Sequence, residues 1–545
     1  MAGDAASWRA RAEWCEARLG EVVAANVGLS EALEKATAQS RDLRALLEQV
    51  TGELATLKRM VFGDSSEKGP RGGGPEAGSG VGGEAGDGKK KRGQRVGASG
   101  PRRRDFSDLP TVDIVYDLDG DQRCCAGCGS GFASFGEQVF EQVDWQVVVV
   151  RLVHRRRRYT RTCRCAGPRV ITAPGPVKAI GKGRFTHGFL ARLLVGKYVA
   201  GQPLHKITAG LAREGLAVPD STLTGALQQV GNLLVPLETA IAARNRASAH
   251  VHVDETTWKV FEPVEGKDST RWWLWVFCAT DTIFFQMDPT RSTTVATEHL
   301  GIDIDAGALS TGDRLVISSD FYGVYQSIAS NIDAVTPLWC WAHMRRYFVR
   351  AGDADPHQLG RWSRLWVQRI RDLYVAHRAL AHATTDSDLA AAQHAFDTAL
   401  QTIDTARHEQ MARPGLQPRA AKVLATLDRE WDGLVAHRDF PLLPLDNNTA
   451  ERALRTPVVG RKNFGGSGTR WAAELAARVW TITATTDLAG LNPITYLTAY
   501  LNACGAAGGT PLTPTDLQRF LPWTASSTDL ATWAAPPRHD HTPAP

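Results

Sequence analysis

The sequence predicts a multidomain α+β protein with a mixed α/β core. Three features of the chain predict this class. Strand patterns cluster after residue 250, long segments on both sides of them have helical periodicity, and a glycine-rich stretch separates the first helix from the rest. The 545 residues are enough for about three or four domains, and a hydrophobic content of 43% allows a sizeable core.

Residues 1–62 predict one long helix with a heptad seam. Apolar side chains recur at alternating spacings of four and three, as at Leu43, Leu47 and Val50. Asn26 lies at a seam position, where a single Asn can fix the register of a dimer. The alternative is an amphipathic helix packed on its own protein. The regular spacing favours a coiled coil, or leucine zipper, through which the chain forms a homo-oligomer.

Two segments have compositions that cannot bury enough apolar surface to fold. Residues 63–104 are rich in Gly and end in basic residues, which predicts a flexible basic linker. Residues 526–545 predict a disordered tail. Between the core and this tail, residues 491–525 predict a C-terminal element that is anchored by Leu521-Pro522-Trp523.

Residues 105–175 predict a small β-rich unit in which segments 143–154 and 155–162 pair as strands. Two cysteine pairs bracket these segments, and they consist of Cys125, Cys128, Cys163 and Cys165. Two turns that carry thiolates and face each other suit tetrahedral Zn²⁺. The alternative is a set of reduced, structurally neutral cysteines, since the C-x-C spacing of the second pair is less common. Cys124 or His154 can replace one ligand.

Residues 176–245 predict helices in a helix-turn-helix arrangement. Segments 202–216 and 221–230 have helical patterns, and a break at residues 218–220 separates them. Asp220 or Ser221 is the expected N-cap of the second helix. Many small helical bundles share this pattern without contacting DNA, so the motif alone does not establish DNA binding.

Residues 246–345 carry the strand patterns of a central sheet. Strands are expected at 250–260, 271–280, 281–288, 314–322 and 335–341, and helices at 293–300 and 322–330. A meander of three strands followed by alternating helices and strands matches an RNase H-like core better than a doubly wound nucleotide-binding fold. Residues 346–440 predict a helical insertion. Residues 441–490 then complete the core with a helix that Asp446, Asn447 or Asn448 caps.

Three carboxylates lie where this strand order brings them together: Asp254 within a strand, Asp320 at a strand end and Glu451 early in a helix. A carboxylate on a central strand is costly unless a cation meets it. Three of them can hold two Mg²⁺ ions, or Mn²⁺, for in-line displacement at a phosphodiester. The alternatives are an ion pair with Arg for Asp254, a helix cap for Asp320 and a capping box with Asn448 for Glu451.

Basic residues surround the predicted site. Arg455 follows Glu451 by one helical turn, Arg461 and Lys462 are expected in a Gly-rich loop, and His343 and Arg346 follow the last strand. They are expected to bind DNA phosphates, with structural ion pairs as the alternative.

Charge runs elsewhere add to this expectation, although the net charge is only +5. The runs are Lys89 to Arg92, Arg102 to Arg104, and Arg155, Arg156, Arg157 and Arg158. One such run is typical of a solvated surface, whereas three ahead of a carboxylate site favour a polyanionic partner. The nine cysteines do not form a disulfide framework, and no apolar run approaches the ~18 residues of a membrane span. We therefore expect a cytoplasmic protein with no membrane contact.

Several motifs resemble those of bacterial insertion-sequence transposases of the IS-sixty-six type, which are DDE transposases. The motifs are H-V-D-E-T-T-W (252–258), S-D-F-Y-G-V-Y (319–325), C-W-A-H-M-R-R-Y-F (340–348), D-N-N-T-A-E-R-A-L-R (446–455), G-R-K-N-F (460–464), L-N-P-I-T-Y-L (491–497) and L-K-R-M-V-F-G-D-S-S-E-K (57–68). The resemblance covers nearly the whole chain. It implies a leucine zipper, a zinc-finger-like DNA-binding domain, a helical segment and a DDE catalytic domain. Cys163-x-Cys165 departs from the second C-x2-C pair that is usual in this family.

This resemblance implies a catalytic triad of Asp254, Asp320 and Glu451 with Mg²⁺ as cofactor. The implied reaction is cleavage at the ends of an insertion sequence followed by strand transfer into target DNA. The implied partners are double-stranded DNA, a second copy of the chain and companion proteins of the same element, and the implied location is the bacterial cytoplasm, at the nucleoid when DNA is bound. The alternatives are a non-catalytic DNA-binding regulator that uses the zipper, zinc unit and helix-turn-helix, and a metallohydrolase that uses His250 and His252.

Overall fold

The computed structural model describes residues 170–263, 269–310 and 312–536, together with 128, 130, 149–160 and 162. The predicted coiled coil, the predicted linker, residues 537–545, and Cys125, Cys163 and Cys165 lie outside the described residues. The chain divides into two compact units, and every helix and strand below belongs to the unit that comprises residues 1–64 and 148–545.

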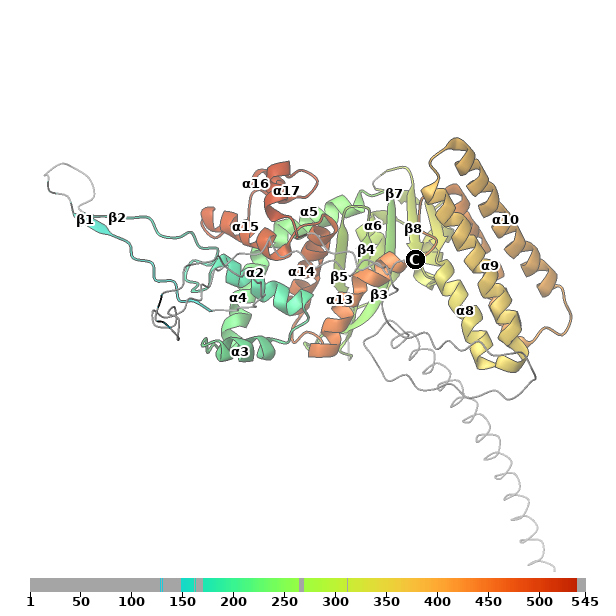
Figure 1. The fold of residues 1–545 in the computed structure, drawn as a ribbon, viewed down its shortest axis with the longest axis horizontal. Helices are drawn as coiled ribbons and strands as arrows, with labels where there is room; N and C mark the ends of the chain where they lie inside the picture. The colour runs from blue at the N-terminus through green and yellow to red at the C-terminus, as the bar shows by residue number, and fades with distance from the viewer. Residues whose placement is uncertain are drawn as a thin grey trace, which may run out of the picture. The chain divides into compact units, whose positions relative to one another are not determined.

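A five-stranded mixed sheet forms the centre of the described structure (Figure 1). Its strand order is β5-β4-β3-β8-β9. The first three strands pair antiparallel, and β8 and β9 continue the sheet in parallel with β3. The bounds are β3 His250–Lys259, β4 Arg271–Cys278, β5 Ile283–Asp288, β8 Leu315–Ser319 and β9 Val335–Trp339. The predicted strands and the mixed α/β class are therefore confirmed. A short hairpin of β6 (Ile302–Asp303) and β7 (Ala308–Leu309) was not expected.

Each face of the sheet packs against its own hydrophobic core. Strand β4, between β5 and β3, is apolar at nearly every position, because alternate side chains enter opposite cores. Leu274 and Val276 belong to one core, and Trp275 and Phe277 to the other. The same alternation in β3 points Asp254 and Glu255 toward opposite faces. The two acids therefore meet different environments although they are adjacent in the sequence.

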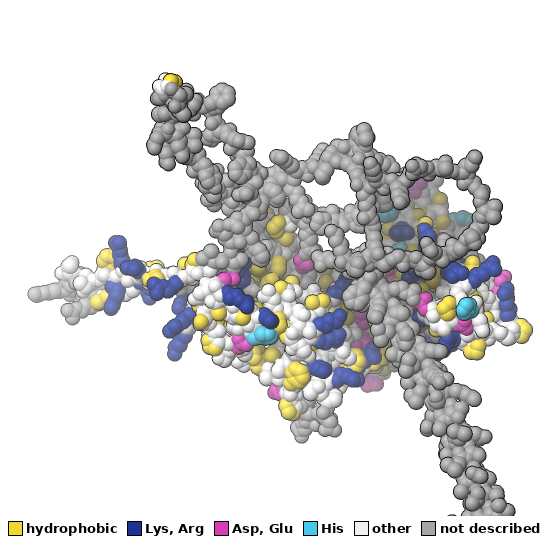
Figure 2. All heavy atoms as spheres, turned by 60° about the horizontal axis from the view of Figure 1, so that its bottom comes forward, with side chains coloured by type: hydrophobic (Ala, Val, Ile, Leu, Met, Phe, Trp, Pro, Cys, Tyr) yellow, Lys and Arg dark blue, Asp and Glu magenta, His cyan; other side chains and the backbone are white. Residues whose placement is uncertain are grey.

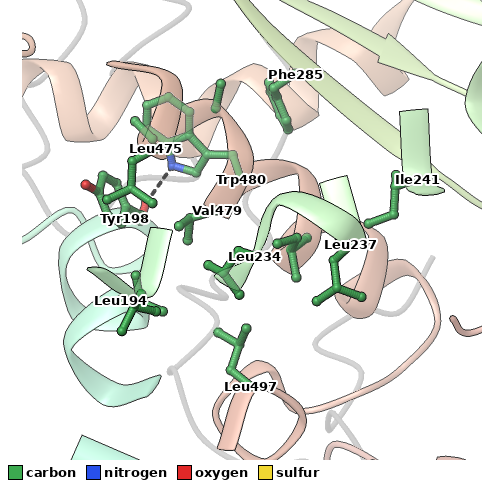
Figure 3. Close-up of a cluster of buried hydrophobic side chains, with 14 of the residues drawn as sticks. Leu194, Tyr198, Leu234, Leu237, Ile241, Phe285, Leu475, Val479, Trp480 and Leu497 are labelled. Carbon is green, nitrogen blue, oxygen red and sulfur yellow. Dashed lines mark hydrogen bonds between the residues drawn. The ribbon is translucent and has the colours of Figure 1, made fainter. Parts of the chain in front are cut away.

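The first face is covered by helices that precede β3 and by helices that follow residue 447. They are α2 His187–Leu194, the π-helix η2 Val195–Val199, α3 Leu204–Arg213, α4 Asp220–Leu233, α5 Val235–Arg246, α13 Asn448–Phe464, α14 Arg470–Leu488, α15 Pro493–Ala506, α16 Pro514–Leu517 and η4 Gln518–Phe520. Figure 3 shows side chains of η2, α5 and α14 pointing toward one another in this core. The buried indole of Trp480 donates to the carbonyl of Tyr198 at 2.8 Å, which ties α14 to η2.

The core on the second face includes side chains of α6 and α7 and of helices between β9 and α13, among which α9 packs on α8 and α10 packs on α9, and not on the sheet. They are α6 Thr293–Leu300, α7 Gly323–Asn331, α8 Trp341–Ala354, α9 Pro356–His382, α10 Asp386–Met411, α11 Pro418–Arg429, α12 Trp431–Val435 and η3 Ala436–Asp439. The helical content predicted between the last strand and residue 440 is thus confirmed. Every helix in the described ranges is too short or too polar to span a bilayer.

The structure corrects the predicted pairing near residue 155. Strand β1 (Arg158–Thr160) pairs with β2 (Val170–Thr172), and residues 149–157 form no strand. The two expected strands are consecutive in the sequence, so no residues remain for a turn between them. In the structure the two paired strands are separated by residues 161–169 in the sequence.

Two further predictions differ from the structure. Arg461 and Lys462 lie in the last turn of α13, not in a loop, because the helix continues past Pro457 and ends where Gly465 adopts a φ of 78°. Residues Ser527–Trp533 form helix α17, where a disordered tail was expected. Trp533 supplies the burial that orders this helix, since its ring stacks on Phe520 at 5.3 Å.

Helix α6 is fixed to the rest of the fold by a buried histidine. The Nε2 atom of His299 lies 2.8 Å from Oδ1 of Asn245 in α5, and Asn245 donates to the carbonyl of Phe277 at 3.0 Å. Burial, with a smaller contribution from Arg246, lowers the pKa of His299 to about 3. The folded protein therefore holds this imidazole neutral.

We predict that acid weakens the fold through His299. The unfolded chain takes up a proton near pH 6.5 and the folded chain near pH 3, so the free energy of unfolding falls below pH 6.5. One such group contributes a loss of about 2 kcal/mol between pH 7 and pH 5. Denaturant titrations of wild type and His299→Gln at both pH values isolate this contribution from other histidines. Equal pH dependence in the two proteins would contradict it.

Candidate active site

The parallel pairing of β3 with β8 brings two of the predicted acids together. His252 lies opposite Ser318 in this pair. The same register, continued by two residues, sets Asp254 beside Asp320, which directly follows the last residue of β8. Neighbouring residues in register point to the same face of a sheet. Asp254 therefore faces the side of the sheet on which α13 lies, and Asp320 follows the neighbouring strand next to it.

The start of α13 is attached to β3 next to Asp254. The buried side chain of Asn447 donates to the carbonyl of Val253 at 2.8 Å, and its Oδ1 lies 3.1 Å from Nδ1 of His252. The backbone N–H of Asn447 also donates to Sγ of Cys340 at 3.2 Å. Glu451 lies one turn into the helix. The sequence indicated Asn447 only as one of three possible caps, and its role in positioning the helix was missed.

Electrostatic coupling places the three acids in one region. The pKa of Asp254 rises to about 8, first because the carboxyl group is buried and then because of the charges of Glu255, Asp320 and Glu451. A backbone hydrogen bond from Glu255 to Asp254 opposes this shift only in part. The protein thus leaves the negative charge of Asp254 undercompensated, as expected for a carboxylate that awaits a cation.

The three acids do not converge on one point. Within the residues that the structure describes, no group of three or more His, Cys, Asp or Glu side chains has a geometry that could hold a metal ion. The carboxylate of Glu451 instead lies 3.6 Å from Nε2 of His343 and 3.6 Å from Nη2 of Arg346. The alternative for Glu451, a capping box with Asn448, is not formed, because Asn448 is already the first residue of the helix. The donor set nevertheless fits a hard divalent ion, since all three donors are carboxylates.

A buried ion pair supports the site from the opposite face of the sheet. The side chain of Glu255 is 2% exposed and accepts hydrogen bonds from Arg291 and from the hydroxyl of Tyr325. The guanidinium of Arg291 lies over the ring of Tyr322 at 3.5 Å. The backbone N–H of Tyr322 donates to Oδ1 of Asp320 at 3.0 Å. This chain of contacts links the neighbour of Asp254 to the turn that carries Asp320.

The sequence predicted only part of this network of contacts around Glu255. The period-2 alternation of β3 points Glu255 to the face of its valines, away from Asp254. Arg291 and Tyr325 were not identified. The available signal was the need for a cation opposite a buried Glu255, but the sequence does not show which arginine meets it.

The two histidines of β3 are held as neutral hydrogen-bonded groups. Nε2 of His250 lies 2.9 Å from Oγ of Ser318, and His252 contacts Asn447 as described above. Burial is the main cause that lowers both pKa values, to about 3 for His250. These contacts within the protein do not favour the alternative in which His250 and His252 hold zinc.

The predicted DNA-binding residues fall into three groups. His343 and Arg346 face Glu451, and burial lowers the pKa of His343. Arg461 contacts Oγ1 of Thr256 at 3.2 Å and the backbone carbonyl of Thr257, so it fastens the end of α13 to β3. The remaining members are exposed and lie away from these contacts, and they are Arg155, Arg156, Arg157, Arg158, Arg455 and Lys462. Of the four predicted zinc ligands, only Cys128 lies in the described part, and it is exposed.

Comparison with known proteins identifies related sequences over this region. The family model described as "Transposase IS66 family" matches residues 182–475, a range that includes all three acids. A relative from Sinorhizobium fredii, the uncharacterized protein y4hP, is 25% identical over 446 residues, which cover 78% of this chain and 77% of the relative. A second protein from the same organism, y4qI, is 24% identical over 451 residues, covering 81% of this chain and 79% of the relative. No solved structure matches the chain.

We predict that the cation of Arg291 is needed because Glu255 is buried. Arg291→Met leaves this carboxylate without its ion-pair partner, and the free energy of unfolding should fall by about 2 kcal/mol or more. The double variant Arg291→Met/Glu255→Gln also removes the uncompensated charge of Glu255, so it should regain part of the lost free energy of unfolding. Urea denaturation of the two single variants and the double variant measures the coupling. Additive losses would show that the pair does not act as a unit.

Proposed function

Since the chain belongs to the IS66 transposase family, we propose that it is a DDE-type DNA transposase. It cleaves DNA at the ends of an insertion sequence and transfers the strand into target DNA, with a divalent metal as cofactor. The observation that supports this most is the acidic centre itself. Asp254 lies two residues beyond the parallel register of β3 with β8, Asp320 directly follows β8, and both Asp320 and Glu451 act electrostatically on the buried carboxyl group of Asp254.

The sheet supports an RNase H-like catalytic core. Its antiparallel β3–β4–β5 meander continues into the parallel strands β8 and β9 on the side of β3. We propose that residues 246–345 and 441–490 form the two parts of this core and that residues 346–440 form an insertion between them. The coiled coil at 1–62 and the zinc unit at 105–175 are further parts of the proposal.

Asp254, Asp320 and Glu451 would hold the metal ions, Mg²⁺ or Mn²⁺. When bound, such ions activate the attacking oxygen and stabilise the leaving oxygen of a phosphodiester. Metal binding requires Glu451 to exchange its contacts with His343 and Arg346 for the metal. Both groups would then be released next to the DNA, where the guanidinium of Arg346 suits a phosphate.

The surrounding residues keep these donors in place. Asn447 fixes the start of the Glu451 helix on β3, and Arg461 fixes its end. The contacts from Glu255 through Arg291 to Tyr322 restrain the turn at Asp320. Pre-organised donors reduce the reorganisation that metal binding demands.

We predict that Asp320→Asn abolishes cleavage of terminal-repeat DNA in Mg²⁺. The loss should reach about 10²–10³-fold or more, the range for removing one group that stabilises transition-state charge. Asp254→Asn and Glu451→Gln should behave alike. DNA binding, measured by gel shift in EDTA, should persist in all three variants, because it depends on the basic residues.

The matched control is Asp313→Asn, the same change at an exposed acid just before β8. It should cleave like wild type. Wild-type cleavage by Asp320→Asn would refute the assignment of the site. DNA binding by the wild type without any metal-dependent cleavage would favour a non-catalytic regulator.

A further inference from the structure

One side of α9 carries a row of exposed arginines. Arg361, Arg364, Arg371 and Arg378 follow one another at spacings of three and seven residues, which places them on the same side of a helix. We call these four residues the arginine stripe. The opposite side of α9 is buried in the hydrophobic core through Leu359, Trp366, Ile370, Leu373 and Leu380. Core packing therefore fixes the stripe toward solvent.

The charges of the stripe are not balanced within the described part of the chain. No ion pair there involves any of its four arginines, whereas exposed Arg438, Arg470 and Arg519 each pair with a carboxylate. The only acid on α9 is Asp372, and it accepts a hydrogen bond from Gln368 at 2.8 Å. A row of like charges on one side of a helix disfavours folding unless a polyanion meets it. Figure 2 shows groups of Lys and Arg side chains on the face of the molecule seen there.

The C-terminal half of α9 packs close to the acidic centre. Tyr374, between Arg371 and Arg378, lies with its hydroxyl 3.5 Å from Oδ2 of Asp446. Nε2 of His377 lies 2.9 Å from the carbonyl of Leu443. Both contacts are with the segment that leads directly into the Glu451 helix, and both residues are half-buried. They place this half of the helix beside that segment, while the arginine stripe lies on the solvent side of the same helix.

We propose that the arginine stripe binds the sugar-phosphate backbone of double-stranded DNA on its way to the acidic centre. From Arg361 to Arg378 the helix rises about 25 Å, which corresponds to about seven base pairs of B-DNA. Guanidinium groups bind phosphate oxygens without reading sequence, so this surface gives affinity and orientation. The inference rests on the proposed function, because that function supplies DNA as the partner.

The test compares two full-length variants that lose the same charge. The first is Arg361→Gln/Arg364→Gln/Arg371→Gln/Arg378→Gln. The second changes four exposed arginines that already pair with acids, Arg244→Gln/Arg438→Gln/Arg470→Gln/Arg519→Gln. Affinity for a labelled duplex is measured by fluorescence anisotropy at several NaCl concentrations in EDTA, so that no cleavage is required.

Loss of all four arginines should lower the slope of log affinity against log salt by about 3.6 units, since each lost phosphate contact contributes about 0.9. Affinity at 0.1 M salt should fall roughly a hundredfold or more. The matched variant should keep nearly the wild-type slope. The inference is overturned if the stripe variant keeps the wild-type slope or if both variants lose the same amount.

Thermal unfolding followed by circular dichroism checks that the stripe variant folds. If it does not, the single variants Arg371→Gln and Arg378→Gln provide the test, each with an expected slope loss of about 0.9. Metal-dependent cleavage by the wild type is measured separately. Absent cleavage with a normal slope loss would overturn the proposed transposase activity and support the DNA-binding stripe.

Discussion

The parallel pairing of β3 with β8 is the constraint on which the rest of the structure depends. It sets Asp254 beside Asp320 in a buried setting where burial and like charges raise the pKa of Asp254 to about 8. Asn447 then attaches the Glu451 helix to the same strand. Neighbouring carboxylates do not stabilise a fold, and for this reason we propose a ligand of positive charge for these acids.

The two faces of β3 differ in how far the charges of their acidic side chains are compensated. Glu255 faces the core between the sheet and α7, where Arg291 and Tyr325 donate hydrogen bonds to it and offset part of the rise in its pKa that burial causes. Asp254 faces α13, and its raised pKa shows that its negative charge is not compensated by a neighbouring cation. The ion pair of Glu255 and Arg291 restrains the turn that carries Asp320, so a structural ion pair on one face supports a chemical site on the other. Beyond the sheet, α9 offers unpaired positive charge that complements a polyanionic substrate.

Local patterns in the sequence predicted much of this architecture. The period-2 alternation of β3 and the apolar run of β4 predicted their strands. The convergence of Asp254, Asp320 and Glu451 on one metal site stays a prediction, since the described residues contain no such group of ligands. Asn447 and Arg291 were missed because their partners lie far away in the sequence, and periodicity does not reveal long-range partners. The end of α13 was misplaced because Pro457 and the following glycines resemble a loop, although the helix reaches Phe464.

The most direct test of the central claim is a metal-rescue measurement on Asp320→Cys. A thiolate binds hard Mg²⁺ poorly and accepts softer ions such as Mn²⁺ or Cd²⁺. If Asp320 is a metal ligand, cleavage of terminal-repeat DNA should be lost in Mg²⁺ and recovered in the softer ions, while Asp320→Ser stays inactive in all of them. Equal activity of Asp320→Cys and wild type in Mg²⁺, or equal rescue of the serine variant, would contradict the account.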